Sequence, residues 1–410
     1  MKKYEKGISL FIVLILVFSI MGCLSDDGDN GTPTSNDKQS TGRFWSSSVV
    51  DSKENIHISY RDITNWKKDK NNPTEIRYTK LDKDGNTIVP DIVLSDKDVE
   101  FQNVIALDPN ENAYVFWIDS ESKQLYFSKI DQNGNILINR AQLHISYDEY
   151  MVEEMFDIKI DVKNEINLIL KLFNSERISE KKYVFEVLDE NGKQVETPIE
   201  VQNSVKYDIY FHNEELTIFM FNKNGTISKL VIIDNIVSQY EPFFYDGFLS
   251  TQASKWYSYI ENDKINILVR YYNETIVKAT LLKIKLNGDI ITNETYIINY
   301  LIYDVCFLGG NVFFTCTKYL LDTDDIDDKL VFISKIDDSG KLLNQWLTID
   351  VVVDSNYNLN LISQRNNEIS LIMDLLIEYK KEGPISWAYS DIYYQKIDTE
   401  GNIIIDLKII

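Results

Sequence analysis

Short apolar stretches recur along the whole chain, and polar turns separate them. Seven of these stretches have the length of a β-strand: residues 56–60, 113–117, 166–170, 216–221, 265–269, 312–316 and 369–373. Their first, third and fifth positions are almost always apolar, and the positions between them are often apolar as well, as at Tyr114 and Phe116. A strand with one solvated face alternates more cleanly. The pattern therefore predicts strands that are covered on both faces by neighbouring sheets.

A polar heptapeptide follows many of these apolar stretches. Residues 129–135 read KIDQNGN, residues 80–86 read KLDKDGN, and residues 396–402 read KIDTEGN. The Asp carboxylate can accept hydrogen bonds from turn N–H groups, and the Gly can adopt the positive φ of a bulged turn. Each copy is therefore predicted to be the turn of a β-hairpin.

The spacing of this turn predicts the architecture. Looser copies lie at 187–193, 283–289 and 335–341, and a degenerate copy ends at Asp234, so seven copies follow one another at intervals of about 50 residues. A repeat of this length with four strands is typical of a propeller blade. The repeat resembles the seven-bladed propellers of secreted prokaryotic surface proteins over residues 44–410. We therefore expect an all-β, seven-bladed β-propeller of four-stranded antiparallel blades.

The N-terminal residues have the pattern of an export signal. A basic start, MKKYEK, precedes an apolar stretch at residues 8–20, which is short for a membrane-spanning helix. Residues 20–23, IMGC, resemble the lipobox of prokaryotic lipoproteins, and this resemblance implies cleavage before Cys23 and lipidation of its thiol. Met21 departs from the small or aliphatic residue that is usual there. We expect a signal peptide at residues 1–22 and a disordered polar linker at residues 23–43, before a propeller at residues 44–410. The alternative is an ordinary secreted protein.

Charge and cysteine content narrow the choice of partners. The 410 residues contain 64 acidic and 42 basic side chains, for a net charge of −22. This balance argues against nucleic-acid binding and serves solubility.

Three cysteines are too few for a disulfide framework. A turn at Gly309 and Gly310 would pair Cys306 with Phe313, which predicts that Cys306 and Cys316 stay unpaired; a three-residue turn centred on Asn311 would bring them opposite each other.

The sequence contains no recognisable catalytic motif. An Asp that recurs once per blade at a turn is expected to be structural. The histidines at 57, 144 and 212 fall in separate blades and lack ligand spacing, so no cofactor is expected. The turn also resembles the sialidase Asp box in position, although it lacks the Ser and the Thr-Trp of that box, and the arginines are scattered singly. One acidic loop, with Asp322, Asp324 and Asp325, could hold calcium.

The loops between second and third strands are the expected ligand-binding region. They share one face of the disc and vary in length, whereas the short Gly turns share the other face. The longest are residues 62–74, 319–329 and 378–390, in blades one, six and seven, which ring closure makes neighbours. Aromatic and basic residues gather in two of them, and these are the candidate ligand-binding residues: Trp66, Lys67, Lys68, Tyr379, Lys380, Lys381, Trp387 and Tyr389. Aromatic faces beside charge suit a sugar ring or an anionic polymer.

Together these patterns predict an exported propeller that a lipidated Cys23 anchors to the outer face of a membrane. The expected role is a binding or scaffolding module for a protein or glycan partner. Two alternatives stay open: a propeller-type glycan hydrolase or lyase, and a structural subunit of an envelope complex.

Overall fold

The computed structural model describes the chain from residue 43 to residue 409 with internal gaps. The residues outside this description are 1–42, 63–73, 96–98, 145–148, 213–214, 223–225, 234–235, 246–252, 262–263, 274–275, 287–288, 299, 320–328, 354–357, 364–367, 383–384 and 410. Within the described residues the chain forms strands and turns, and none of it forms a helix long and apolar enough to span a membrane.

Twenty-eight strands form seven four-stranded sheets, each built from four consecutive strands. Blades one and two contain β1 (Arg43–Val50), β2 (Ile56–Asp62), β3 (Glu75–Leu81), β4 (Thr87–Ser95), β5 (Val99–Leu107), β6 (Ala113–Asp119), β7 (Leu125–Ile130) and β8 (Ile136–Gln142). Blades three and four contain β9 (Tyr150–Ile160), β10 (Ile166–Asn174), β11 (Lys181–Leu188), β12 (Ile199–Glu200), β13 (Lys206–His212), β14 (Glu215–Phe221), β15 (Thr226–Ile233) and β16 (Ile236–Tyr245).

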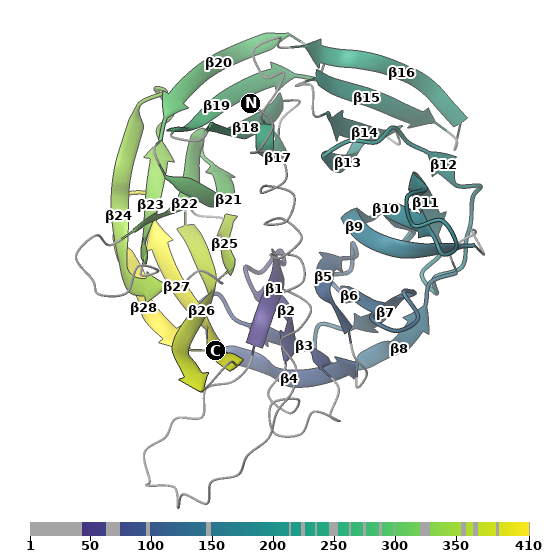
Figure 1. Ribbon diagram of the computed structural model, residues 1–410, viewed down its shortest axis with the longest axis horizontal. Helices are drawn as coiled ribbons and strands as arrows, with labels where there is room; N and C mark the ends of the chain where they lie inside the picture. The colour runs from purple at the N-terminus through teal and green to yellow at the C-terminus, as the bar shows by residue number, and fades with distance from the viewer. Residues whose placement is uncertain are drawn as a thin grey trace, which may run out of the picture.

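Blades five to seven complete the ring. Blades five and six contain β17 (Ala253–Glu261), β18 (Lys264–Asn273), β19 (Ile276–Lys285), β20 (Ile290–Ile297), β21 (Leu301–Leu308), β22 (Asn311–Tyr319), β23 (Lys329–Ile336) and β24 (Leu342–Val353). Blade seven contains β25 (Asn358–Ser363), β26 (Glu368–Glu382), β27 (Ile385–Asp398) and β28 (Ile403–Ile409). All pairings are antiparallel, and the first strand of each blade lies nearest the axis of the ring (Figure 1). The predicted seven-bladed propeller is confirmed.

The second strands are buried on both faces, as their sequence predicted. Every side chain of β6 is buried, including Tyr114, Phe116 and Trp117, none of which reaches solvent. The two faces of β6 belong to different apolar clusters: one cluster contains β10 of blade three, and the other contains β3 of blade one. The stacking of blades on both sides therefore explains the absence of clean alternation.

The ring closes by side-chain packing, because blades one and seven exchange no strand. One apolar cluster spans the two blades and includes Ile58, Tyr60, Ile372 and Tyr394. Two polar side chains of blade seven, the Tyr394 hydroxyl and the Lys396 ammonium, donate hydrogen bonds at 3.3 and 3.0 Å to the carbonyl of Lys83 in blade one. Blade seven is thus the neighbour of blades one and six, as predicted.

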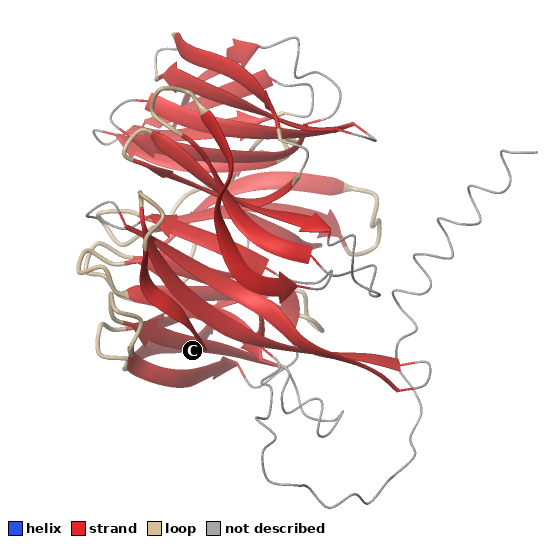
Figure 2. Ribbon diagram, turned by 90° about the vertical axis from the view of Figure 1, so that its left-hand side faces the viewer, coloured by secondary structure: helices blue, strands red, loops and turns tan. Residues whose placement is uncertain are grey.

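The two faces of the disc differ. The short turns that join first to second and third to fourth strands gather along one edge of the side view (Figure 2). In the same view, one pair of strands extends beyond the others at the opposite edge. The longest strands of the chain are β24, β26 and β27, and of these β26 and β27 pair with each other.

The turn at Gly309 and Gly310 has the predicted register. Cys306 pairs with Phe313 across β21 and β22, and both glycines have positive φ. Cys306 and Cys316 are buried and form no disulfide, and this prediction is confirmed. Burial raises the pKa of the Cys316 thiol well above its ordinary value.

Candidate functional site

Many of the predicted site residues fall outside the described residues. This applies to Cys23 with the signal peptide and linker, to Trp66, Lys67 and Lys68, and to the acidic loop with Asp322, Asp324 and Asp325. The other five candidates lie on strands, and the structure describes their backbone.

The stretch from Glu378 to Ser390 is a β-hairpin, and its prediction as a loop was wrong. Strands β26 and β27 run past the blade and stay paired as far as Glu382 and Ile385. Tyr, Ile and Trp favour extended backbone, which lets this charged stretch continue the ladder. A bulge between Leu376 and Glu378 marks the start of the extension, and bulges bend a strand and increase its twist. We call residues 378–389 the blade-seven arm.

The register of the arm brings basic and aromatic positions together. Lys380 is paired with Trp387, and Glu378 is paired with Tyr389. On the other positions of the same ladder, Tyr379 is paired with Ala388 and Lys381 with Ser386. The five arm candidates, which the sequence places up to ten residues apart, therefore lie within one short hairpin.

The repeated turn acids that the structure describes have structural roles, as expected, whereas Asp234 lies outside the described residues. The Asp131 carboxylate accepts hydrogen bonds from the backbone N–H groups of Asn133 and Asn135 at 2.9 and 2.8 Å, and from the Asn135 amide at 2.8 Å. Asp82 and Asp398 repeat these contacts. The Asn135 amide and the turn N–H groups hold the pKa of Asp131 below its ordinary value. A carboxylate engaged in this way closes a turn and is not available as an array for a substrate.

A second set of the same turns joins first to second strands, and the sequence reasoning missed it. Asp51, Asp108 and Asp161 each accept the backbone N–H groups two and four residues later, at 2.8–2.9 Å. These turns contain no Gly, and Glu54 and Glu111 adopt the positive φ instead. The signal was an Asp five residues before each of the first three second strands.

Polar side chains also tie neighbouring blades together near the axis. Gln102 of β5 accepts a hydrogen bond from the backbone N–H of Met155 at 2.8 Å, and Asp157 of β9 accepts one from Ile209 at 2.7 Å. Asp304 of β21 accepts one from the backbone N–H of Leu361 in blade seven at 2.8 Å. Burial raises the pKa of Asp304 to about 6, against the lowering effect of the backbone N–H groups of Leu361 and Val305.

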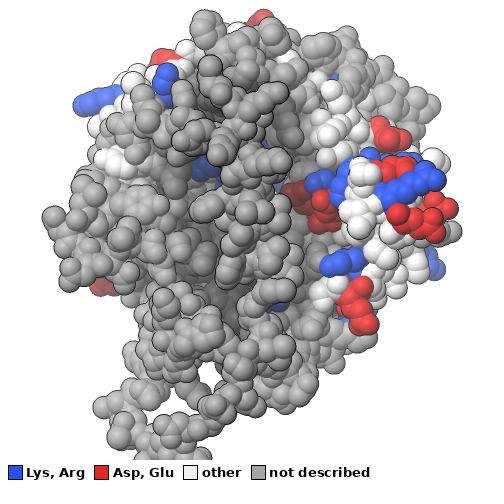
Figure 3. Space-filling model, viewed as in Figure 1, with Lys and Arg blue, Asp and Glu red and all other residues white. Residues whose placement is uncertain are grey.

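The carboxylates near the axis are accompanied by basic side chains. The ammonium groups of Lys159 and Lys206 lie 3.6 and 3.1 Å from Asp157 and Asp208. The Ser258 hydroxyl of blade five bonds to Asp208 of blade four. Acidic and basic side chains are also intermixed on the described part of the face in Figure 3. In blade three, Lys171 and Lys181 pair with Glu153. These groups therefore compensate one another and stiffen the ring.

His57 lies in a buried hydrogen-bonded network of blade one. A Tyr78 hydroxyl lies 2.8 Å from Nδ1 of His57, and Asp51 Oδ2 lies 3.3 Å from Nε2. Burial lowers the pKa of His57, although Asp51 opposes this effect. Among the described residues no three His, Cys, Asp or Glu side chains form a group that could hold a metal ion.

Comparison with known proteins finds distant structural neighbours and no match to a family. No protein-family model matches it, and no curated protein matches it. Among solved structures, the β-propeller domain of the trilobed protease from Pyrococcus furiosus is 9% identical, with a TM-score of 0.48 over 90% of this chain and 97% of that chain. A polysaccharide lyase is 9% identical with a TM-score of 0.38, over 56% of this chain and about half, 55%, of the lyase. A Hadza microbial sialidase is 10% identical with a TM-score of 0.42, over 71% of this chain and 63% of the sialidase. The names of these distant structural neighbours give differing activities, and likeness of fold does not imply a shared function.

Proposed function

We propose that this chain is an exported, lipid-anchored propeller that binds a protein or glycan partner at the cell surface through the blade-seven arm. The observation that carries the proposal is the arm itself. It continues two strands of a rigid blade beyond a bulge and brings Lys380 opposite Trp387 and Glu378 opposite Tyr389. Aromatic and charged positions on a rigid support are typical of binding surfaces.

The export part of the proposal rests on residues 1–43. A short apolar segment, the lipobox-like residues 20–23 and a polar linker together favour a propeller held near a membrane by one lipidated cysteine. Cys23→Ala tests this part. The wild type is expected in the membrane fraction with an acylated N-terminal Cys23, and the variant in the soluble fraction. An unmodified N-terminus at another residue would overturn it.

The binding part is tested by removing the arm. Residues 378–389 are replaced by an Asn-Gly turn, which suits a two-residue hairpin loop. Reversible cross-linking on intact cells is expected to capture one stoichiometric protein or a bound glycan with the wild type. Capture should be lost with the arm-less variant while its melting temperature is kept. Trp66→Ala and Trp387→Ala are expected to weaken capture individually.

Two results would replace this proposal with one of the alternatives. Release of oligosaccharides from a polysaccharide panel by the wild type would assign a hydrolase or lyase. A stoichiometric complex that forms equally with and without the arm would assign a structural subunit, because binding would then use another surface.

A further inference from the structure

A row of two paired residues crosses each blade near the face that carries the Gly turns. Its members are paired residues on the second and third strands: His57 with Lys80, Tyr114 with Lys129, Asn167 with Val187, Thr217 with Val231, Asn266 with Lys283, Phe313 with Lys335, and Ser370 with Lys396. Five of the seven rows therefore contain a lysine, and this lysine is the first residue of the repeated heptapeptide. These equivalent positions allow the surroundings of one lysine to be compared with those of the others.

In three blades this lysine is buried beside a carboxylate of its own blade. Lys80 lies 3.0 Å from Asp51, and Lys129 lies 3.4 Å from Asp108. Lys396 pairs with Glu368. An ammonium removed from water needs such a partner, because the cost of desolvation is otherwise several kcal/mol.

In blade six the lysine is covered by aromatic rings. The Lys335 ammonium lies 5.2 Å from the centre of the Phe313 ring and 5.3 Å from that of the Trp346 ring. It also donates a hydrogen bond at 2.9 Å to the carbonyl of Thr399 in blade seven. This lysine too is buried and compensated.

Blade five differs from these four blades at two positions. Asn266 stands where blade two has Tyr114 and blade six has Phe313. Two residues before it, Lys264 stands where blade seven has Glu368. The Lys283 ammonium donates a hydrogen bond at 3.3 Å to the carbonyl of Gly310 in blade six, and Lys283 stays partly exposed. Among the side chains that the structure describes, no carboxylate forms an ion pair with Lys264 or Lys283.

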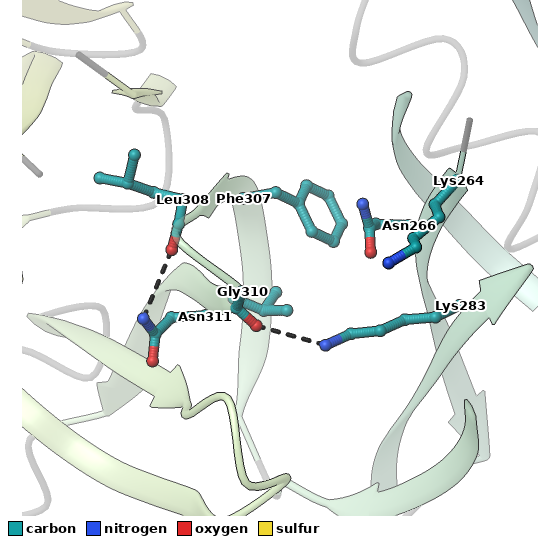
Figure 4. A pocket seen from close by; sticks show the side chains of 8 residues that line it. Lys264, Asn266, Lys283, Phe307, Leu308, Gly310 and Asn311 are labelled. Carbon is teal, nitrogen blue, oxygen red and sulfur yellow. Dashed lines mark hydrogen bonds between the residues drawn. The ribbon is translucent and has the colours of Figure 1, made fainter. Parts of the chain in front are cut away.

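A pocket of about 220 Å³ opens at this place between blades five and six. Figure 4 shows the side chains of Lys264, Asn266 and Lys283 on one side and Phe307 with the Gly310 turn on the other. The ring of Tyr259, paired with Asn266 across the sheet, is parallel to that of Phe307 at 6.1 Å. The volume corresponds to about seven water molecules, which is room for one ring-sized group and its substituents.

We propose that this pocket binds a saccharide residue that bears a carboxylate. The ligand carboxylate takes the position that Glu368 takes in blade seven and compensates Lys264 and Lys283. Phe307 supplies an apolar surface for the C–H face of a sugar ring, and the Asn266 amide is placed to bond a hydroxyl. This inference rests on the proposed function only in that the propeller is a binding module, since the pocket is lined by blades five and six.

Calorimetry with glucuronate tests the inference on the purified propeller. The wild type is expected to bind glucuronate at least tenfold more tightly than glucose. Lys264→Glu should weaken glucuronate binding at least tenfold, because the new carboxylate copies Glu368 of blade seven and compensates Lys283 in place of the ligand. Lys278→Glu is the matched control: it makes the same charge change on β19, five positions from Lys283, where the alternation of a strand directs side chains to the other face of the blade. Its affinity for glucuronate should stay within twofold of the wild type.

A second variant keeps the charges and removes the space. Asn266→Tyr copies blade two, and it should abolish glucuronate binding while the far-ultraviolet circular dichroism spectrum and the melting temperature are retained. Equal affinities for glucose and glucuronate, equal losses with Lys264→Glu and Lys278→Glu, or displacement of glucuronate by equimolar inorganic sulfate would each overturn the inference.

The two proposals can fail separately. If the arm-less variant binds glucuronate normally but cells yield no arm-dependent partner, the pocket stands and the arm proposal falls. If glucuronate does not bind the wild type but an arm-dependent partner is captured, the arm proposal stands and the pocket inference falls.

Discussion

Blade two and blade five place the repeated lysine in the same strand register but in different surroundings. In blade two, Lys129 is 7% exposed, lies 4.9 Å above the ring centre of Tyr114, and pairs with Asp108. In blade five, Lys283 is partly exposed beside Asn266, and a pocket opens in front of it. The registers of the two rows are the same, since Lys129 pairs with Tyr114 on the second strand of its blade and Lys283 pairs with Asn266 on the second strand of its own.

The difference shows that the repeat fixes the register of the lysine, and that two neighbouring side chains decide whether its ammonium group is buried or exposed. In blade two the Tyr114 ring and the Asp108 carboxylate make the lysine part of the core. In blade five Asn266 stands in place of the ring and Lys264 lies two residues before it, so the ammonium groups stay in contact with solvent, where they can bind an anion. This contrast between the two blades leads to four expected outcomes.

The largest effect is expected from removing the ring in blade two. Tyr114→Ala deletes a fully buried side chain that stacks on Phe116 and Phe127. Such deletions cost about 3–5 kcal/mol of the free energy of unfolding. Asn266→Ala should cost less than about 1 kcal/mol, because Asn266 is only partly buried. Urea denaturation of both variants measures the contrast, and equal losses would contradict it.

The next effect concerns the carboxylate of blade two. Asp108→Asn leaves the Lys129 ammonium with the half-exposed Glu190, 3.2 Å away, as its remaining carboxylate. We expect a loss of about 3 kcal/mol, at the lower end of the range for a broken buried ion pair. Lys283→Gln in blade five should change the free energy of unfolding by less than about 0.5 kcal/mol. Comparable losses in the two variants would show that the lysines are equivalent.

A third prediction uses pH. Burial alone would raise the pKa of Asp51, but hydrogen bonds from His57, Asn55 and Lys80 outweigh it and hold the pKa well below its usual range. The folded carboxyl thus has a lower pKa than the unfolded one, whose pKa is near 3.8. Its stabilisation is complete above that pH and is lost as the pH falls below it, by about 1.4 kcal/mol per pH unit.

The measurement is urea denaturation of the wild type and of Asp51→Asn at pH 6, 4 and 2.5. The difference between the two proteins should shrink by about 2 kcal/mol between pH 4 and pH 2.5. Lys283→Gln should follow the wild-type pH profile throughout, because Lys283 pairs with no described carboxylate. A constant difference for Asp51→Asn would exclude a lowered pKa.

The smallest effect is expected from Lys264→Glu. The new carboxylate would lie in a partly solvated pocket beside Lys283, where an ion pair contributes about 0–1 kcal/mol. The melting temperature should therefore be unchanged or slightly higher, although glucuronate binding is lost. A large drop in melting temperature would indicate that Lys264 has a structural role.

The repeat, the seven second strands and the role of the turn acids could be predicted from the amino-acid sequence. The reason is that these features are local. Alternation along a five-residue stretch reports burial on both faces, and an Asp followed three residues later by a Gly suffices to define the turn. The pairing of Cys306 with Phe313 followed from the same local turn chemistry.

The arm, the ring closure and the pocket depend on contacts between strands and blades that the sequence pattern does not contain. The charged Tyr379 to Lys381 segment looked like a loop, but pairing with residues 386–388 makes it a strand, and such pairing depends on a partner. The hydrogen bond from Lys396 to Lys83 joins residues more than 300 positions apart, which only ring closure brings together. The pocket likewise combines Asn266 and Phe307 from different blades. Contacts between blades depend on how the sheets stack around the axis, and no pattern within a single repeat contains that geometry.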